Sequence, residues 1–265
     1  MRSITLAMIG AGALAAGVAL ANPGDPFGGD ETGCVPGTKG ALRCEGKLTK
    51  VTAKLIGAVI RCHIDQAGAA FQGGDFAESQ CEESAKAKYD RDLGRLAAGG
   101  TCPQEVLDGA AQQEVLLLAG QGQITPPALD PLNATIFCDA ASGAPLTGAA
   151  GDPDGDDGGF VPATVENLKC AIGVAKDVSK LWTDILTRCH YRAALYGFRG
   201  DYADDEACEE GAYGVRTRYD GLAAKLVAAG ICPSCLDGPG QSALGTAIQG
   251  RADQDNGLIF VCPAP

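Results

Sequence analysis

Residues 44–63 read CEGKLTKVTAKLIGAVIRCH, a segment in which apolar residues alternate with Lys, Thr and Gly. Its apolar residues and cysteines recur at steps of three or four, at Cys44, Leu48, Val51, Leu55, Val59 and Cys62. This spacing is the period of one face of an α-helix. The segment therefore predicts an amphipathic helix whose buried stripe begins and ends with cysteine.

A shift of about 127 positions, with small gaps, superposes the chain on itself. The second stripe consists of Cys170, Val174, Val178, Leu181, Ile185 and Cys189. Further matches pair Arg61-Cys62-His63 with Arg188-Cys189-His190, Cys81-Glu82-Glu83 with Cys208-Glu209-Glu210, Tyr89 with Tyr219, Cys102-Pro103 with Cys232-Pro233, Asp130 with Asp253, and Asn133 with Asn256. The sequence therefore predicts a duplicated unit.

Each predicted unit holds a second helix that runs from Cys81 or Cys208 to a glycine stop, at Gly99-Gly100 or Gly230, where glycine can adopt the left-handed conformation. The predicted fold class is all-α, with two tandem repeats of a disulfide-stapled antiparallel helical hairpin plus a short third helix. The predicted boundaries are a signal peptide at 1–21, a Gly/Pro-rich lead-in at 22–40, unit A at 41–138, an acidic Gly/Pro/Ala linker at 139–164 and unit B at 165–265.

Twelve cysteines, all beyond the predicted signal peptide, indicate six disulfides. A hairpin brings the ends of consecutive helices together, and bridged Cα atoms must lie within about 7 Å. The expected pairs are Cys44 with Cys102, Cys62 with Cys81, Cys170 with Cys232, Cys189 with Cys208, and by elimination Cys34 with Cys138 and Cys235 with Cys262. Cys235 competes with Cys232 for Cys170, and this alternative stays open.

Residues 1–21 have the features of a cleaved secretory signal: Arg2, an apolar run over 4–18, and Ala19-Leu20-Ala21. Cleavage predicts a periplasmic or extracellular protein with no membrane segment.

The chain has a formal charge of −12, which becomes −13 without Arg2. An acidic chain with no basic stripe disfavours binding to nucleic acid and to anionic membranes. The expected partner is an unidentified protein or small ligand.

The cysteine pattern resembles the twin-cysteine helical hairpins of the mitochondrial intermembrane space, although the spacings here are about twice as long, so the resemblance concerns architecture. The chain also looks like a loose group of uncharacterised secreted bacterial proteins with cysteine-punctuated, Ala- and Lys-rich helices. This second resemblance covers both units and implies no particular activity.

The two histidines, His63 and His190, occupy the same repeat position, each directly after a cysteine. A Cys-His pair is found at c-type haem sites, but a second cysteine normally lies three residues before the first, and here Val59 and Leu186 stand there. Haem is therefore not expected. The favoured interpretation is that each imidazole caps the end of the first helix.

A disulfide from Cys62 to Cys81 brings His63 near Glu82 and Glu83, and the second copy brings His190 near Glu209 and Glu210. One imidazole with two carboxylates is a weak set of ligands for a divalent metal, and an ordinary ion pair is expected first.

The predicted linker carries Asp152, Asp154 and Asp156, the alternating acids of a calcium loop. Asp157 stands where such loops have glycine and Ala163 where they have glutamate, so a solvated linker is expected before a calcium site.

Cys232-Pro233-Ser234-Cys235 has redox spacing without a strand-to-helix context, which favours a structural role. The chain lacks the sequence motifs of common enzymes. The predicted function is a non-enzymatic binding or structural module, with a redox, metal or haem carrier that uses Cys62-His63 and Cys189-His190 as the alternative.

Overall fold

The computed structural model describes residues 22–27, 32–119, 128–146, 158–201 and 205–262. These residues form helices joined by turns, with two isolated β-bridges, Pro26 to Cys34 and Pro145 to Phe160, in place of any sheet. The all-helical prediction is confirmed. No helix in the described ranges has both the length and the apolar content needed to cross a membrane.

The first half of the chain contains α1 (Lys39–Phe71), α2 (Glu78–Ala98), α3 (Gln104–Ala119) and α4 (Leu129–Ile136). The Thr38 hydroxyl caps α1 by accepting a hydrogen bond from the Ala41 amide at 3.1 Å. Since α1 extends beyond its cysteines in both directions, the predicted boundary at residue 41 falls inside the helix.

The second half contains α5 (Val165–Asp184), a π-helical segment (Ile185–His190), α6 (Tyr191–Phe198), α7 (Asp205–Glu209), α8 (Val215–Ala228) and α9 (Gly238–Ile259). The predicted continuous helix from Cys208 to Gly230 is wrong, because residues 210–214 separate α7 from α8. The third helix is also not short, since α9 has 22 residues. The glycine stops are confirmed, because Gly100 and Gly230 both have positive φ.

The π-helical segment accounts for a difference in residue number between the halves. Cys44 and Cys62 are 18 positions apart, whereas Cys170 and Cys189 are 19 apart. A π turn holds one residue more than an α turn, so it absorbs an inserted residue without ending the helix. The segment brings Cys189 and His190 back to the buried side of the helix.

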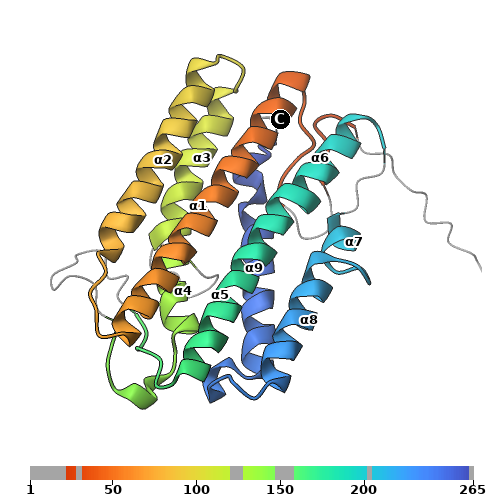
Figure 1. Ribbon diagram of the computed structural model, residues 1–265. Helices are drawn as coiled ribbons and strands as arrows, with labels where there is room; N and C mark the ends of the chain where they lie inside the picture. Colours follow the sequence, from red (N-terminus) through yellow and green to blue (C-terminus); the bar gives the residue numbers. More distant parts are fainter. Residues whose placement is uncertain (1–21, 28–31, 120–127, 147–157, 202–204, 263–265) are drawn as a thin grey trace, which may run out of the picture.

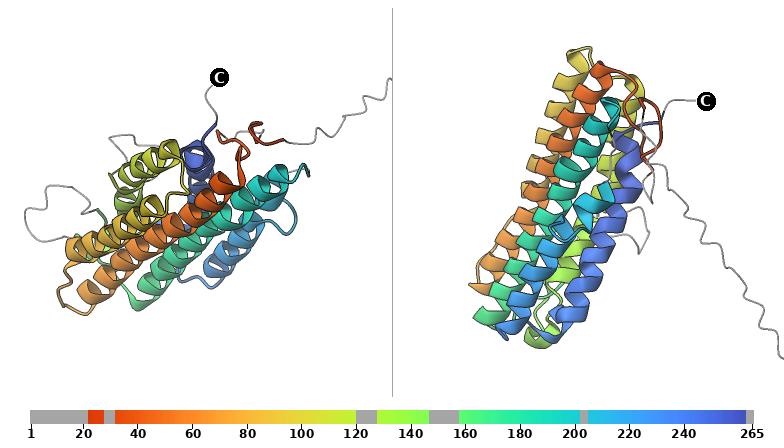
Figure 2. Two further views of the ribbon diagram at one scale, coloured as in Figure 1. Left: turned by 90° about the horizontal axis from the view of Figure 1, so that it is seen from above. Right: turned by 90° about the vertical axis from the view of Figure 1, so that its right-hand side faces the viewer.

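The long helix of the first half runs antiparallel to that of the second half, and the helices form one elongated bundle (Figures 1 and 2). A methyl group on Gly46 would collide with the Tyr191 ring, and one on Gly57 would lie 3.7 Å from the Ser179 hydroxyl. Gly46, early in α1, therefore faces α6, whereas Gly57, further along α1, faces α5, which precedes α6. This is the order expected of antiparallel helices. At 1.5 Å per residue, His63 and His190 are roughly 24 Å apart along the pair.

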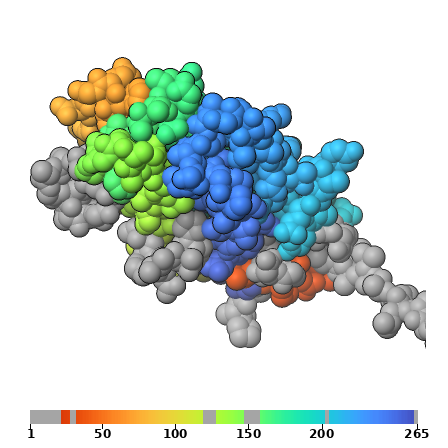
Figure 3. Space-filling view, turned by 90° about the horizontal axis from the view of Figure 1, so that it is seen from below, coloured from red at the N-terminus to blue at the C-terminus, as the bar shows by residue number. Residues whose placement is uncertain are grey.

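The buried residues form one continuous hydrophobic core with contributions from both halves, including Leu48, Ile56, Phe137, Trp182 and Phe260. The α3 and α9 helices also pack closely, because a methyl group on Gly109 would collide with the Leu258 carbonyl oxygen. The lower end of the bundle, seen in Figure 3, places orange, green and blue segments from both halves side by side.

Four of the predicted disulfides are confirmed. The Cα atoms of Cys62 and Cys81 are 5.8 Å apart and those of Cys189 and Cys208 are 5.4 Å apart. The Cα distance is 5.1 Å for Cys44 with Cys102 and for Cys170 with Cys232. The competition between Cys232 and Cys235 is thereby resolved in favour of Cys232.

The remaining two predicted disulfides are wrong. Cys34 bonds to Cys262, with Cα atoms 4.8 Å apart, and Cys138 bonds to Cys235, at 6.2 Å. Both bonds join one half of the chain to the other. The pairing by elimination assumed that each half closes on itself, but antiparallel docking places the end of each half beside a segment of the other.

Several predictions lie outside the described residues. The predicted signal peptide at 1–21 is among these, as are Asp152, Asp154 and Asp156 of the possible calcium loop. All twelve cysteines are described and none is free, which indicates an oxidising environment.

Candidate functional site

His63 lies in the interior of α1 and not at its end, so the predicted helix-capping role is wrong. The helix continues to Phe71, and the His63 side chain is only 2% exposed. Its Nε2 atom lies 3.2 Å from Glu78 Oε1 and 2.8 Å from Glu82 Oε1. Asp130, at the start of α4, completes the group, because ligand atoms of His63, Glu82 and Asp130 all lie within 4.8 Å of one another.

His190 has equivalent surroundings in the second half. Its side chain is fully buried, and its Nε2 atom lies 3.0 Å from Glu209 Oε1 and 3.5 Å from Asp253 Oδ1. Ligand atoms of these three residues also lie within 4.8 Å of one another. We call the two groups cluster A (His63, Glu78, Glu82 and Asp130) and cluster B (His190, Asp205, Glu209 and Asp253).

Helical spacing explains which acids reach each histidine. Glu78 and Glu82 are four residues apart on α2, and Asp205 and Glu209 are four apart on α7, so both members of each pair lie on one helix face. The disulfides at Cys81 and Cys208 hold that face against the histidine-bearing helix. The predicted contributions of Glu83 and Glu210 are wrong, because these side chains follow one position later and are exposed.

Each cluster concentrates more acids than its imidazole can balance. Burial raises the pKa of the Glu209 carboxyl, and the carboxylates of Asp253 and Asp205 raise it further, while the hydrogen bond and charge of His190 oppose these effects. Asp205 belongs to the cluster electrostatically, and its side chain is 5% exposed. Carboxylates that crowd together away from water are stabilised by a proton or by a bound cation.

The donor atoms suit a small divalent metal ion. Metal–ligand bonds of about 2.1 Å place neighbouring ligands about 3.0 to 3.5 Å apart, and the distances within the clusters are 2.8 to 3.5 Å for the nitrogen–oxygen pairs. One imidazole with two or three carboxylates matches divalent transition-metal ions such as Zn²⁺, Mn²⁺ and Fe²⁺, whereas Ca²⁺ prefers oxygen ligands alone.

Cys62 and Cys189 cannot serve as the thiol partners of their histidines, because each is disulfide-bonded. The predicted alternative of a carrier based on Cys-His pairs therefore loses its sulfur ligand and its thioether to haem. Cys232 and Cys235 bond to Cys170 and Cys138 and not to each other, so they do not form a C-x-x-C redox couple.

Sequence reasoning missed four members of the clusters, namely Glu78, Asp130, Asp205 and Asp253. A signal for them was present. Asp130 and Asp253 match in the self-alignment, and Glu78 and Asp205 each precede a matched cysteine by three residues. The alignment indicates a repeated fold, but it gives no reason to expect that α4 approaches His63 or that α9 approaches His190.

Comparison with known proteins adds no relative: no family model, no curated protein and no solved structure matches this chain. The class of the protein is therefore defined by its own features, as an all-helical chain linked by six disulfides that carries two buried histidine–carboxylate clusters.

Proposed function

We propose that this chain is an exported, non-enzymatic helical module that binds one divalent transition-metal ion at each of its two buried clusters. The observation that carries the proposal is recurrence. A buried histidine with two or three carboxylates is costly to maintain, and the same set occurs twice, roughly 24 Å apart. In the self-alignment His63, Glu82 and Asp130 correspond to His190, Glu209 and Asp253.

We further propose that the chain arose by duplication of one unit made of two antiparallel helices and a third segment. The matched residues support this origin, as do the disulfides Cys62–Cys81 and Cys189–Cys208, which both span 19 residues. Export is supported by the six disulfides and by the signal-like sequence at 1–21.

A structural rather than catalytic metal role follows from burial. A catalytic metal keeps a position open to water or substrate, whereas a structural metal is enclosed by protein ligands. His190, Glu209 and Asp253 are each at most 4% exposed. The metal would join three separate helices in each half: α1, α2 and α4 in the first, and the π-helical segment, α7 and α9 in the second.

The test is a calorimetric titration of Zn²⁺ into the oxidised mature protein after removal of metal with a chelator. We expect a stoichiometry of two, with one site lost in His63→Ala, one in His190→Ala and both in the double variant. Glu83→Gln and Glu210→Gln are the matched controls, because these exposed neighbours of Glu82 and Glu209 should leave both sites intact. Mg²⁺ and Ca²⁺ should bind more weakly than Zn²⁺.

The proposal fails if the folded protein binds no Zn²⁺, or if the histidine variants bind it with unchanged stoichiometry. Circular dichroism of each variant establishes that the fold is retained. Glu82→Gln and Glu209→Gln keep side-chain size and provide a second route to the same comparison, because loss of one carboxylate should weaken one site.

A further inference from the structure

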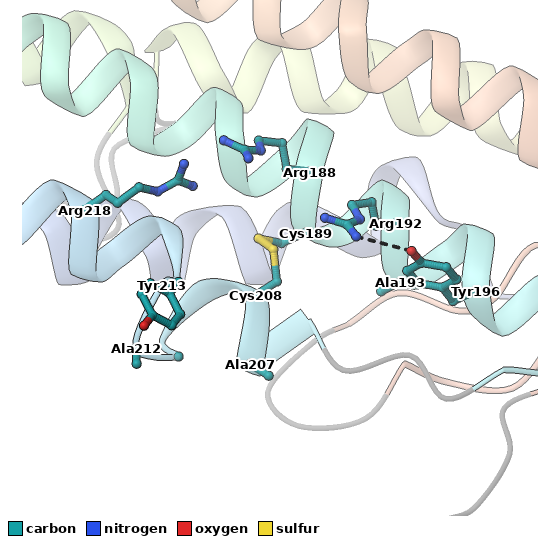
Figure 4. A pocket seen from close by; sticks show the side chains of 11 residues that line it. Arg188, Cys189, Arg192, Ala193, Tyr196, Ala207, Cys208, Ala212, Tyr213 and Arg218 are labelled. Atoms are coloured by element: carbon teal, nitrogen blue, oxygen red, sulfur yellow. Dashed lines mark hydrogen bonds between the residues drawn. A yellow bond between two sulfur atoms is a disulfide. The ribbon is translucent and has the colours of Figure 1, made fainter.

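The second half of the molecule contains a cavity of about 410 Å³ that opens to solvent beside the Cys189–Cys208 disulfide (Figure 4). Its wall comes from the end of the π-helical segment, from α6, α7 and α8, and from the break between α7 and α8. Three arginines, Arg188, Arg192 and Arg218, line it, and among its described lining residues there is no acid. A cavity of this size suits a small organic molecule.

The arginines give this cavity a positive charge in a chain whose net charge is −12. Asp184 contacts two of these arginines, and its Oδ2 atom lies 3.4 Å from Arg188 Nη1 and 3.8 Å from Arg218 Nη2. The same oxygen also lies 3.1 Å from Lys180 Nζ. The single negative charge of Asp184 is thus shared among Arg188, Arg218 and Lys180, and it cannot neutralise all three.

Arg192 is held by a neutral partner. It donates a hydrogen bond to the Tyr196 hydroxyl at 3.2 Å, and its guanidinium lies 5.7 Å from the centre of that ring. Arg192 and Tyr196 are four residues apart on α6, so the helix itself positions the guanidinium at the cavity, as Figure 4 shows. This arrangement leaves guanidinium N–H donors for an anion.

The cavity also offers apolar surface. The disulfide, Ala193, Ala207 and Ala212 supply part of the lining, and Tyr213 stands at the edge with its side chain 95% exposed. A tyrosine side chain has only two dihedral angles to fix, so it can stack on a ligand at low conformational cost.

The cavity lies where the second half departs from the first. The extra residue between Cys170 and Cys189 produces the π turn that carries Arg188 and Cys189. Three more residues separate Cys208 from Tyr219 than separate Cys81 from Tyr89, and they fall in the break that contains Tyr213. In the self-alignment Arg192 corresponds to Asp65, which forms an ion pair with Arg61 at 3.4 Å in the first half.

From these observations we infer that the cavity is a binding site for a small organic anion with a planar apolar body. A phosphate or carboxylate group would contact Arg188, Arg192 and Arg218, and the planar part would lie against the disulfide and Tyr213. The inference does not rest on the proposed metal sites, because neither cluster contributes a residue to the cavity.

The test is a calorimetric titration of phenyl phosphate into the oxidised protein with chelator present. Phenol and inorganic phosphate are comparators that each offer half of the proposed ligand. We expect saturable binding of one phenyl phosphate per chain, tighter than either comparator and weaker as salt increases. Arg192→Gln and Arg218→Gln should each weaken binding about tenfold, the effect of losing one charged hydrogen bond. Tyr213→Ala should weaken it less.

Arg61→Gln is the matched control, since this arginine corresponds to Arg188 but lies in the half that has Asp65. It should leave phenyl phosphate affinity unchanged. The inference is overturned if phenyl phosphate does not bind, if Arg192→Gln and Arg218→Gln both bind it as tightly as the parent protein, or if inorganic phosphate binds equally well. Because the chelator removes metal, failure here leaves the metal proposal intact.

Discussion

The two halves of this molecule share a cysteine frame and a buried histidine, yet they differ where the second half has more residues between matched positions. The first half keeps α1 as one regular helix of 33 residues and α2 as one of 21. The second half interrupts its long helix with a π turn and breaks its second helix at residues 210–214. The comparison shows that a buried histidine–carboxylate cluster is present in both halves despite these differences, and that the cationic cavity lies where the second half differs from the first.

The disulfides between the halves provide the largest test of this comparison. Cys34→Ser with Cys262→Ser opens a bond of sequence separation 228, whereas Cys62→Ser with Cys81→Ser opens one of 19. We expect the first pair to lower the free energy of unfolding by about 5 kcal/mol and the second by about 3 kcal/mol, because longer closed loops constrain the unfolded chain more. Urea unfolding measures both. Equal or reversed losses would contradict the expectation.

Glu45 is a buried ionisable group that distinguishes the halves, since the self-alignment places Ala171 at its position. Burial, with a smaller contribution from nearby Glu105, raises the pKa of the Glu45 carboxyl to about 8. The folded pKa exceeds the ordinary value of 4.5, so the stabilising contribution of the protonated form is complete below pH 4.5 and is lost as pH rises through 8. The free energy of unfolding should fall by roughly 5 kcal/mol across this window.

Glu45→Gln should remove that fall, and urea unfolding measured from pH 4.5 to pH 9 shows whether it does. Glu105→Gln is the control, because it removes the smaller cause and should preserve most of the pH dependence. A parent protein whose stability is constant over this range would rule out a buried, neutral Glu45.

The contact between α3 and α9 tests how the two halves pack against each other. Gly109→Ala places a methyl group against the Leu258 carbonyl oxygen and should cost about 1 to 3 kcal/mol, because the backbone of α9 must move. Gly94→Ala on α2 meets nothing within 4 Å and should stabilise the protein by up to about 1 kcal/mol through helix propensity. Thermal unfolding of both variants checks the contrast. Equal behaviour would argue against close packing of α3 on α9.

The smallest predicted effect concerns a feature that the halves share. The Tyr89 hydroxyl donates to the Ala110 carbonyl at 3.1 Å, and the Tyr219 hydroxyl donates to the Gln241 carbonyl at 2.8 Å. Tyr89→Phe and Tyr219→Phe should each lower the free energy of unfolding by about 1 kcal/mol, since each leaves a buried carbonyl without this donor. Chemical unfolding of the two variants should give similar losses, and a loss confined to one half would show that the tyrosines are not equivalent.

The amino-acid sequence by itself determined the first helix of each half and α2, the glycine stops at Gly100 and Gly230, and the four disulfides within the halves. These features depend on spacing along one or two neighbouring helices, which the periodicity of apolar residues and cysteines records directly. The sequence also determined that His63 and His190 occupy matched positions, and that Glu82 and Glu209 lie near them.

Only the tertiary structure decided the Cys34–Cys262 and Cys138–Cys235 pairs, the inclusion of Asp130 and Asp253 in the clusters, and the position of the cationic cavity. These features depend on how helices distant in sequence dock, and apolar periodicity marks a buried face without naming its partner. The side chains that meet across the core are therefore fixed by the packing of whole helices, which no single stretch of sequence contains.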